Sequence, residues 1–329
     1  MANLLEIWTT TRLRLMVELE RCGSLSQAAE KVGLSQPSAS EHIRIINRAA
    51  GEPVVVRNGR TLALSPAGRM VAAYAAHALS NLVAGESALA ARIGLRAGSL
   101  RLAASSVPGT YIVPDVLVSF QEEAPDVSIE FSVGSTAEVR QWILSGRASC
   151  AVTCGDIADD RLKVSPVGPD DIKAVAQPGL LALTSMGQAH PSQLDKQTLL
   201  VQEFGSSTRN YAQQILEGTT YRFRRVWELG SVDAVKRAAR QGSGIAFLST
   251  HTVVEERRRG ELITFDVLGV PKPSRRVNVV RATGSPENPA ERFFESLLRA
   301  QLSAHTQDGS RALNGSATIP PIGTSTAQG

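Results

Sequence analysis

Polar side chains of several kinds are concentrated in one segment near the N-terminus, Gly23–Arg48, which reads GSLSQAAEKVGLSQPSASEHIRIINR. Its second half mixes apolar residues with Ser, Gln, His and Arg, which an ordinary core helix would not need. Gln and Arg side chains carry the donors and acceptors that pair with base edges in the DNA major groove. The segment therefore predicts a helix that contacts nucleic acid.

Three helices are predicted around this segment. Apolar residues at helical spacing indicate the first over residues 12–22, and the glycine that follows ends it. Ser26 is the predicted N-cap of the second helix, which ends at Gly33. Ser35 caps the third, with Pro37 in its first turn, where a missing N–H costs nothing. Two short helices, a glycine-containing turn and a polar-faced third helix form a helix-turn-helix.

A hairpin is predicted next, over Pro53–Leu64, where two β-favouring runs flank Asn58-Gly59. We expect this hairpin to be a wing whose arginines contact phosphates. The alternative is a structural helical bundle with a solvated polar face, and the hairpin and the long helix after it disfavour that alternative. The predicted DNA-binding residues are Ser26, Gln36, Pro37, Ser38, Ser40, Glu41, Arg44, Arg48, Arg57 and Arg60.

A long Ala-rich helix follows, from Pro66 to about Ile93, and its apolar seam needs a covering partner. Ala97-Gly98 is the predicted linker to the rest of the chain. Beyond it, strand and helix patterns alternate, which indicates βαβ units and mostly parallel sheets. The last stretch, residues 303–329, is rich in Ser, Thr, Gly and Pro without apolar periodicity and is predicted to be a disordered tail.

The order of these motifs resembles a known family. GSLSQAAEKVGLSQPSASEHIR, the Arg-Asn-Gly-Arg wing and the Ser-Pro-Ala-Gly start of the long helix are similar to LysR-type transcriptional regulators, and the resemblance covers about residues 12–302. EFGSSTRNY and SSVPGTYIVP are similar to the branch that regulates carbon-fixation operons and sulfur assimilation. The effectors of that branch are phosphorylated or oxyanionic metabolites.

The resemblance implies an α/β protein with an N-terminal all-α winged helix-turn-helix, a long linker helix and a two-lobed α/β effector domain resembling periplasmic solute-binding proteins. It also implies assembly as a homodimer or homotetramer through the linker helix. The implied boundaries are 1–65 for the winged domain, 66–97 for the linker and 98–302 for the effector domain, with lobe I at about 98–160 and 269–302 and lobe II at about 161–268.

Carried over by position, Gln36, Pro37, Ser40 and Arg44 match the family's DNA-facing motif, and Arg57 and Arg60 match its wing. Three departures stand out. Glu41 replaces a residue that is usually basic, and it either accepts from a cytosine amino group or weakens DNA binding. His42 replaces a common Gln, and Val54-Val55-Val56 replaces the usual Leu-Phe entry to the wing, which is a packing change.

The effector site is expected between the lobes, beyond the carboxyl ends of strands and near helix N-termini. Gly155–Arg161 and Gly269–Ser274 are the predicted crossovers. Hydroxyls and N–H groups at helix starts, with the donor fork of Arg209, indicate a small anionic metabolite. The alternative is that the Ser and Thr residues only cap helices. The predicted effector residues are Ser105, Ser106, Val107, Ser135, Thr136, Ser206, Ser207, Thr208 and Arg209.

Composition and the remaining motifs narrow the function classes. The 329 residues carry 35 Lys and Arg against 31 Asp and Glu, a mild basic excess that permits a nucleic-acid partner without requiring one. A signal peptide, a membrane span and motifs for catalysis, metals or dinucleotides are not found, so we expect a cytoplasmic, non-enzymatic protein without a cofactor. Cys150 and Cys154 lie too far apart along one strand for a disulfide, which disfavours redox sensing.

The expected mechanism follows from these parts. Two chains pair through the linker helix and place two recognition helices in successive major grooves of double-stranded DNA. Effector binding shifts the lobes, provided that the effector prefers one arrangement of them. The shift then alters DNA bending or contact with RNA polymerase. The competing classes are an enzyme built on the α/β half and a transporter's solute-binding protein.

Overall fold

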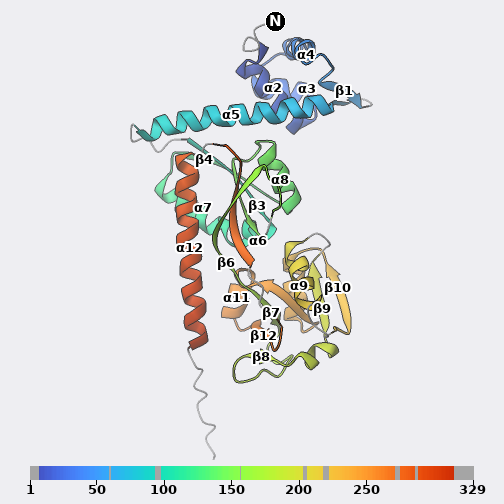
Figure 1. Cartoon of the computed structure of the whole chain (residues 1–329), viewed down its shortest axis with the longest axis vertical. Coiled ribbons are helices and arrows are strands. Elements are labelled where there is room, and N and C mark those ends of the chain that lie inside the picture. The colour runs from blue at the N-terminus through green and yellow to red at the C-terminus, as the bar shows by residue number, and fades with distance from the viewer. Residues whose placement is uncertain are drawn as a thin grey trace, which may run out of the picture.

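The computed structural model of the chain describes residues 7–58, 61–92, 98–155, 157–202, 206–217, 222–270, 275–285 and 288–314 (Figure 1). An N-terminal helical domain with a hairpin is joined by one long helix to two lobes, each built on a β-sheet. Among the helices in this described part of the chain, none is long and apolar enough to span a membrane.

The N-terminal domain is a winged helix-turn-helix. Its three helices pack around a core that includes Leu15, Ala28, Ala39 and Ile46, all of which are fully buried. The small Ala28 lets the first two helices cross closely, and Gly33 turns the chain with a φ of 75°. The elements are α2 (Thr10–Cys22), α3 (Leu25–Val32), α4 (Gln36–Ala50) and the antiparallel pair β1 (Val55–Asn58) and β2 (Thr61–Leu64).

The N-cap of α3 differs from the predicted one. Ser24, and not Ser26, caps the helix, because its hydroxyl accepts from the N–H of Gln27 (3.5 Å). The helix begins at Leu25, which packs against the core of the winged domain. Apolar packing therefore moves the N-cap two residues earlier, and Ser26 lies exposed inside the first turn.

The long helix α5 (Pro66–Arg92) starts against the wing. Ser65 caps it by accepting from the N–H of Gly68 (3.0 Å). A Cβ atom at Gly68 would lie 1.9 Å from the carbonyl oxygen of Val54, so only glycine permits this approach. The predicted Ser-Pro-Ala-Gly helix start thus also fixes the angle between α5 and the hairpin.

The middle of α5 rests on lobe I. His77 Nε2 lies 2.8 Å from the carbonyl oxygen of Leu144. Gly146, at a φ of 67°, packs so closely on Ala76 that a Cβ would meet its carbonyl carbon at 2.9 Å. In Figure 1, α5 crosses between the bulk of the winged domain and lobe I, so it connects the two physically as well as in sequence.

Lobe I contains a five-stranded sheet in the order β4-β3-β5-β13-β6. The first three strands are parallel, while β13 runs antiparallel to both neighbours, so the sheet is mixed rather than mostly parallel. Its strands are β3 (Gly98–Ser105), β4 (Val127–Gly134), β5 (Cys150–Cys154), β6 (Leu162–Asp170) and β13 (Arg275–Ala282). Its helices are α6 (Ser106–Tyr111), α7 (Val113–Glu123), α8 (Thr136–Leu144) and α12 (Pro289–Asn314).

Lobe II contains a six-stranded sheet in the order β10-β9-β11-β7-β12-β8. Its strands are β7 (Ile172–Ala176), β8 (Gln188–Ala189), β9 (Thr198–Gln202), β10 (Arg225–Leu229), β11 (Ile245–Ser249) and β12 (Ile263–Val267). Its helices are η1 (Pro191–Lys196), α9 (Ser207–Glu217), α10 (Val232–Arg240), η2 (Thr250–Val253) and α11 (Val254–Arg258).

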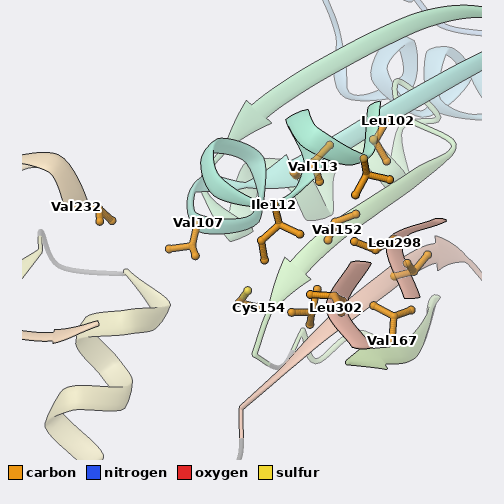
Figure 2. Close-up of a cluster of buried hydrophobic side chains, with 14 of the residues drawn as sticks. Leu102, Val107, Ile112, Val113, Val152, Cys154, Val167, Val232, Leu298 and Leu302 are labelled. Carbon is orange, nitrogen blue, oxygen red and sulfur yellow. The ribbon is translucent and has the colours of Figure 1, made fainter. Parts of the chain in front are cut away.

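One hydrophobic cluster extends across both lobes. It includes Val107 of α6, Ile112 and Cys154 from lobe I and Val232 of α10 from lobe II, and Figure 2 draws this part of it. Burying apolar surface between the lobes favours the arrangement seen here. Any movement of one lobe against the other has to repack these side chains.

The first crossover between the lobes lies later in the chain than predicted. β6 pairs with β13 from Leu162 to Asp170, so these residues belong to lobe I and the crossover follows Asp170 instead of occupying residues 155–161. Most side chains of β6 are exposed or half-buried, and two prolines and a glycine lie in it, which hides the strand pattern. The return falls between Val267 and Arg275, within the predicted interval.

The C-terminal helix is longer than predicted. α12 extends to Asn314, so residues 303–314 of the predicted tail are helical, and residues 315–329 lie outside the described part of the chain. This stretch mixes good helix formers (Ala, Gln, Arg, Leu) with poor ones (Gly, Asp, Asn, Thr, Ser), so its composition alone does not account for the extension. The absence of apolar periodicity was therefore a poor sign of disorder.

The core of lobe I depends on aromatic packing between α7 and α12. Phe294 is 1% exposed, and its ring lies edge-on to that of Phe120 at 6.5 Å between centroids. We expect Phe294→Ala to lower the free energy of unfolding by about 3–5 kcal/mol, because it removes a buried ring and leaves a cavity. Urea unfolding measures this change. Val118→Ala on the exposed face of α7 is the control, and an equal loss for both variants would contradict this packing.

Candidate DNA-binding surface and effector site

α4 presents a polar face to solvent. Ala39, Ile43 and Ile46 bury its other face in the winged domain. Ser35 caps the helix, and its hydroxyl accepts from the N–H of Ser38 at 3.3 Å. The predicted DNA-binding residues on this helix, all of which are exposed, are Gln36, Pro37, Ser38, Ser40, Glu41, Arg44 and Arg48. The helix α4 lies on the side of the winged domain away from lobe I (Figure 1).

Glu41 and Arg44 form a two-pronged ion pair on this face. Arg44 Nε donates to Oε2 of Glu41 at 2.7 Å, and Nη2 donates to Oε1 at 2.6 Å. These hydrogen bonds lower the pKa of the Glu41 carboxyl from its ordinary value. Glu41 therefore neutralises, in the absence of DNA, one of the cations predicted to contact DNA.

His42, the neighbouring departure from the family pattern, points away from the exposed face. Its Nδ1 atom accepts from Arg12 Nε at 3.1 Å, and the ring is half-buried. Arg12 Nη1 also donates to the carbonyl oxygen of Ile7 at 2.7 Å. His42 thus links α4 to the start of α2 and is a positioning residue of the winged domain.

The wing is an antiparallel pair, as the Asn-Gly signal indicated. Arg57 lies on β1 opposite Leu62, and Arg60 lies outside the described residues. Val54 is fully buried, Val55 packs on the same core and Val56 is 44% exposed. Two of the three valines thus pack in the core at the place where the family usually has Leu-Phe, so the departure is a packing change, as expected.

The predicted lobe I residues after β3 have different environments. Ser105 is buried at the end of β3 and, within the described chain, makes no cap hydrogen bond to α6. Ser106 is exposed. The Val107 side chain lies in the hydrophobic cluster that joins the lobes, so it is a core residue and not a side-chain contact for a ligand.

Ser135 and Thr136 begin α8, and a carboxylate already occupies this helix start. Glu138 Oε2 accepts from the N–H of Ser135 at 2.8 Å and from its hydroxyl at 2.7 Å. The Ser135 hydroxyl accepts in turn from the N–H of Glu138 at 3.2 Å. The hydrogen bonds from Ser135 lower the pKa of Glu138. This capping box matches the alternative in which Ser135 only caps a helix.

The predicted lobe II residues lie around the start of α9. The Ser206 hydroxyl donates to Gln202 Oε1 at 3.0 Å, and Ser207 is the first residue of the helix. Arg209 Nη1 donates to the carbonyl oxygen of Gln202 at 3.2 Å and to Glu228 Oε2 at 2.6 Å. The donor fork expected for an anion is thus held by an exposed carboxylate of the same lobe.

A buried polar cluster at the crossovers was not predicted. Asp170, at the end of β6, accepts from Arg275 Nε and from the Ser249 hydroxyl, both at 2.5 Å. Arg275 Nη1 also donates to the hydroxyl of Thr208 in α9 at 3.2 Å. Burial raises the pKa of the adjacent Cys154 thiol, and the nearby Asp170 raises it further. The cluster ties both crossover segments to a predicted effector residue, Thr208.

Sequence patterns offered little sign of this cluster. Asp170 and Arg275 are 105 residues apart, and each has a second residue of like charge beside it, which is typical of exposed loops. They differ from other charged pairs only in position, since Asp170 ends the strand before lobe II and Arg275 begins the strand after it. Because residues 162–170 were assigned to lobe II, the end of β6 was not recognised as the crossover, and the pair was not predicted.

Two cavities lie between the parts of the molecule. One, of about 500 Å³, lies between the lobes and is lined by Tyr111, whose hydroxyl donates to Asp233 Oδ1 at 2.7 Å, and by Lys236 and His251. The other, of about 480 Å³, lies between the winged domain and lobe I. The nine predicted effector residues do not line either of these two cavities. Within the described ranges, His, Cys, Asp and Glu side chains form no group of three or more that could hold a metal ion.

A winged helix with a polar recognition helix, joined by a long helix to a two-lobed α/β domain, defines a DNA-binding regulator with a ligand-sensing domain. Residues 10–69 match the family described as "Bacterial regulatory helix-turn-helix protein, lysR family", and residues 94–303 match "LysR substrate binding domain". The chain therefore belongs to the LysR family of transcriptional regulators, and the resemblance found in the sequence is confirmed.

Relatives carry names from one branch of this family. The "Probable RuBisCO transcriptional regulator" of Nostoc sp. is 28% identical over 269 residues, which cover 80% of each chain. "HTH-type transcriptional regulator CbbR" of Rhizobium meliloti is 28% identical over 264 residues, covering 80% of this chain and 84% of CbbR. The predicted similarity to carbon-fixation regulators is therefore confirmed.

Solved structures share the fold. A full-length OxyR variant from Pseudomonas aeruginosa is 20% identical with a TM-score of 0.72 and covers 89% of this chain and 95% of its own. The regulatory domain of Synechocystis CcmR, in complex with 2-PG, is 24% identical with a TM-score of 0.55 and covers 62% of this chain and 97% of its own. At these identities the likeness establishes the architecture alone.

Because Glu41 is paired with Arg44, we expect removal of the Glu41 charge to strengthen DNA binding. Glu41→Gln removes a negative charge from the DNA-facing surface and releases Arg44 for phosphate contact. We expect binding to random-sequence duplex to tighten about threefold or more, with a log–log salt slope steeper by about one, because one more cation is available. Fluorescence anisotropy over a salt series measures both quantities.

Glu52→Gln is the matched control, since Glu52 is exposed just beyond the end of α4 and is not one of the predicted DNA-binding residues. It should leave the slope unchanged. Weaker binding or an unchanged slope for Glu41→Gln would show that Glu41 does not restrain Arg44.

Proposed function

We propose that this LysR-type regulator binds promoter DNA through the polar face of α4 and that a small anionic metabolite held between its two lobes modulates that binding. The observation that carries the proposal is the position of Arg209 at the start of α9, where its guanidinium is paired with an exposed carboxylate, Glu228. An incoming anion can replace this carboxylate without leaving a buried charge behind. A regulator of this kind works in the cytoplasm and needs no catalytic step.

The proposed effector site joins the two lobes. Ser105, Ser106 and Thr136 supply it from lobe I, and Ser206 to Arg209 supply it from lobe II. The chemistry of these groups, hydroxyls with one guanidinium, favours a phosphorylated or oxyanionic ligand. The anion 2-PG in the complex of the CcmR domain belongs to this chemical class and is a suitable first probe.

The proposed assembly is a homodimer or homotetramer. α5 exposes large apolar side chains that a second copy of the helix would cover. These exposed residues are Met70, Tyr74, Leu82 and Leu89. Paired linker helices would place two α4 helices in successive major grooves. A shift of the lobes would then change DNA bending or contact with RNA polymerase.

Titration calorimetry with 2-PG, sulfate, sulfite and sugar phosphates tests the effector proposal. We expect Arg209→Gln to weaken binding of the preferred anion about 10- to 100-fold, because it removes a hydrogen bond between charged groups. Glu228→Gln should tighten binding, because it removes the competing carboxylate. Arg240→Gln is the matched control, since Arg240 of lobe II is similarly paired with Glu261 (3.0 Å). Equal affinity for the wild type and Arg209→Gln would remove Arg209 from the site.

A further inference from the structure

The cavity between the winged domain and lobe I has an unusual lining. Arg21 of α2 and Lys31 of α3 face it from the winged domain, while Glu130, Ser132 and Arg147 face it from lobe I. Trp142 of α8 also lines it. The cavity measures about 480 Å³, which is large enough for a small ligand. Charged groups from two separate domains thus point into one space.

Positive charge is in excess around this space. Three cations line it against a single carboxylate, Glu130. Glu18 lies beside them and pairs with both Arg21 (3.0 Å) and Lys31 (3.5 Å), and even when it is counted the cations outnumber the carboxylates. Arg21 and Lys31 share the single carboxylate of Glu18, so the winged-domain side of the cavity carries one more positive than negative charge.

A further arginine lies at the domain junction. Arg101 of β3 is half-buried, and its Nη1 donates to the carbonyl oxygen of Gly146 at 3.0 Å, where α5 rests on lobe I. Burial lowers the pKa of the Arg101 guanidinium and the positive charge of Arg21 lowers it further, while the carboxylates of Glu130 and Glu291 raise it. Arg101 therefore lies among charges of both signs and adds no clear excess to the cavity.

Groups suited to hold an oxyanion are present on both sides. The Arg147 guanidinium lies 4.6 Å from the centroid of the Trp142 ring, and this stacking holds it at the rim of the cavity. Ser132 adds a hydroxyl donor on β4. Guanidinium, ammonium and hydroxyl donors together are the set that binds phosphate groups.

We propose that this cavity is a second anion site, separate from the effector site between the lobes, and that it takes a small doubly charged oxyanion such as phosphate or a phosphate ester. The bound anion bridges Arg21 and Lys31 of the winged domain to Arg147 of lobe I. It supplies negative charge between cations of the two domains and so holds the DNA-binding domain against the effector domain. The orientation of α4 for DNA would then depend on the anion.

Calorimetric titration of the full chain with inorganic phosphate, at constant ionic strength and with chloride as the competing anion, tests this site. We expect Arg147→Gln and Lys31→Gln each to weaken phosphate binding about 10-fold or more, the change caused by losing one charge-assisted hydrogen bond. Arg140→Gln is the matched control, because Arg140 lies on α8 outside the cavity and pairs with Asp159. Circular dichroism of each variant checks that it is folded.

The other outcomes are decisive. Absence of phosphate binding by the wild type, or equal affinity for the wild type and Arg147→Gln, would overturn the site. Loss for Arg147→Gln without loss for Lys31→Gln would place the anion on lobe I alone and overturn the bridge. Loss only for Arg209→Gln would place phosphate in the effector site, which would overturn this inference and leave the proposed function intact.

Discussion

The ion pair between Asp170 and Arg275 joins two neighbouring strands of lobe I, β6 and β13, at the point where the chain passes to and from lobe II. Both side chains are almost completely buried, and the pair is completed by hydroxyls of Ser249 and Thr208 from lobe II. Removing one member of such a pair costs about 3–5 kcal/mol, because the other charge stays buried without its partner. The end of β11 and the start of α9 in lobe II are therefore tied to lobe I through this pair.

Carboxylates of the chain occupy several positions where an external anion is expected. Glu41 is paired with Arg44 on the DNA-facing helix, Glu138 caps α8 where lobe I was predicted to bind the effector, and Glu228 holds Arg209 in lobe II. Each internal pair keeps a cation or helix start satisfied in the unliganded protein. If ligand or DNA binds at these places as proposed, it has to exchange with a carboxylate, which lowers the free energy gained on binding and makes that binding depend on salt.

Much of the fold could be predicted from short sequence motifs. Ser35, Pro37 and Gly33 mark the helix-turn-helix because capping and turn chemistry act over a few residues, and the Asn-Gly hairpin followed from the same rules. The prediction that Ser26 caps α3 was wrong, because Leu25 packs on the core and the helix begins there. The residues of β6 were assigned to the wrong lobe, because the partner strand β13 lies more than 100 residues away and the pattern of β6 is polar.

The sites were less predictable than the fold. The exposed face of α4 could be read from its polar residues, since helical periodicity assigns faces directly. The core position of Val107 and the pairing of Asp170 with Arg275 could not be predicted from the sequence, because both depend on contacts between distant segments of the chain. The cations at the domain junction, such as Arg21 and Arg147, meet only after the winged domain, α5 and lobe I have been placed together.

The central claim is that the polar face of α4 lies in the DNA major groove. Attaching an iron chelate to the thiol of a Ser38→Cys variant and mapping the cuts it makes in bound DNA tests the claim directly. We expect two clusters of major-groove cuts about one helical turn apart, one for each recognition helix of a dimer. The same chelate chemistry applied to the wild type, which has Cys22, Cys150 and Cys154, gives the background. Cuts spread evenly along the duplex, or none above that background, would contradict the account.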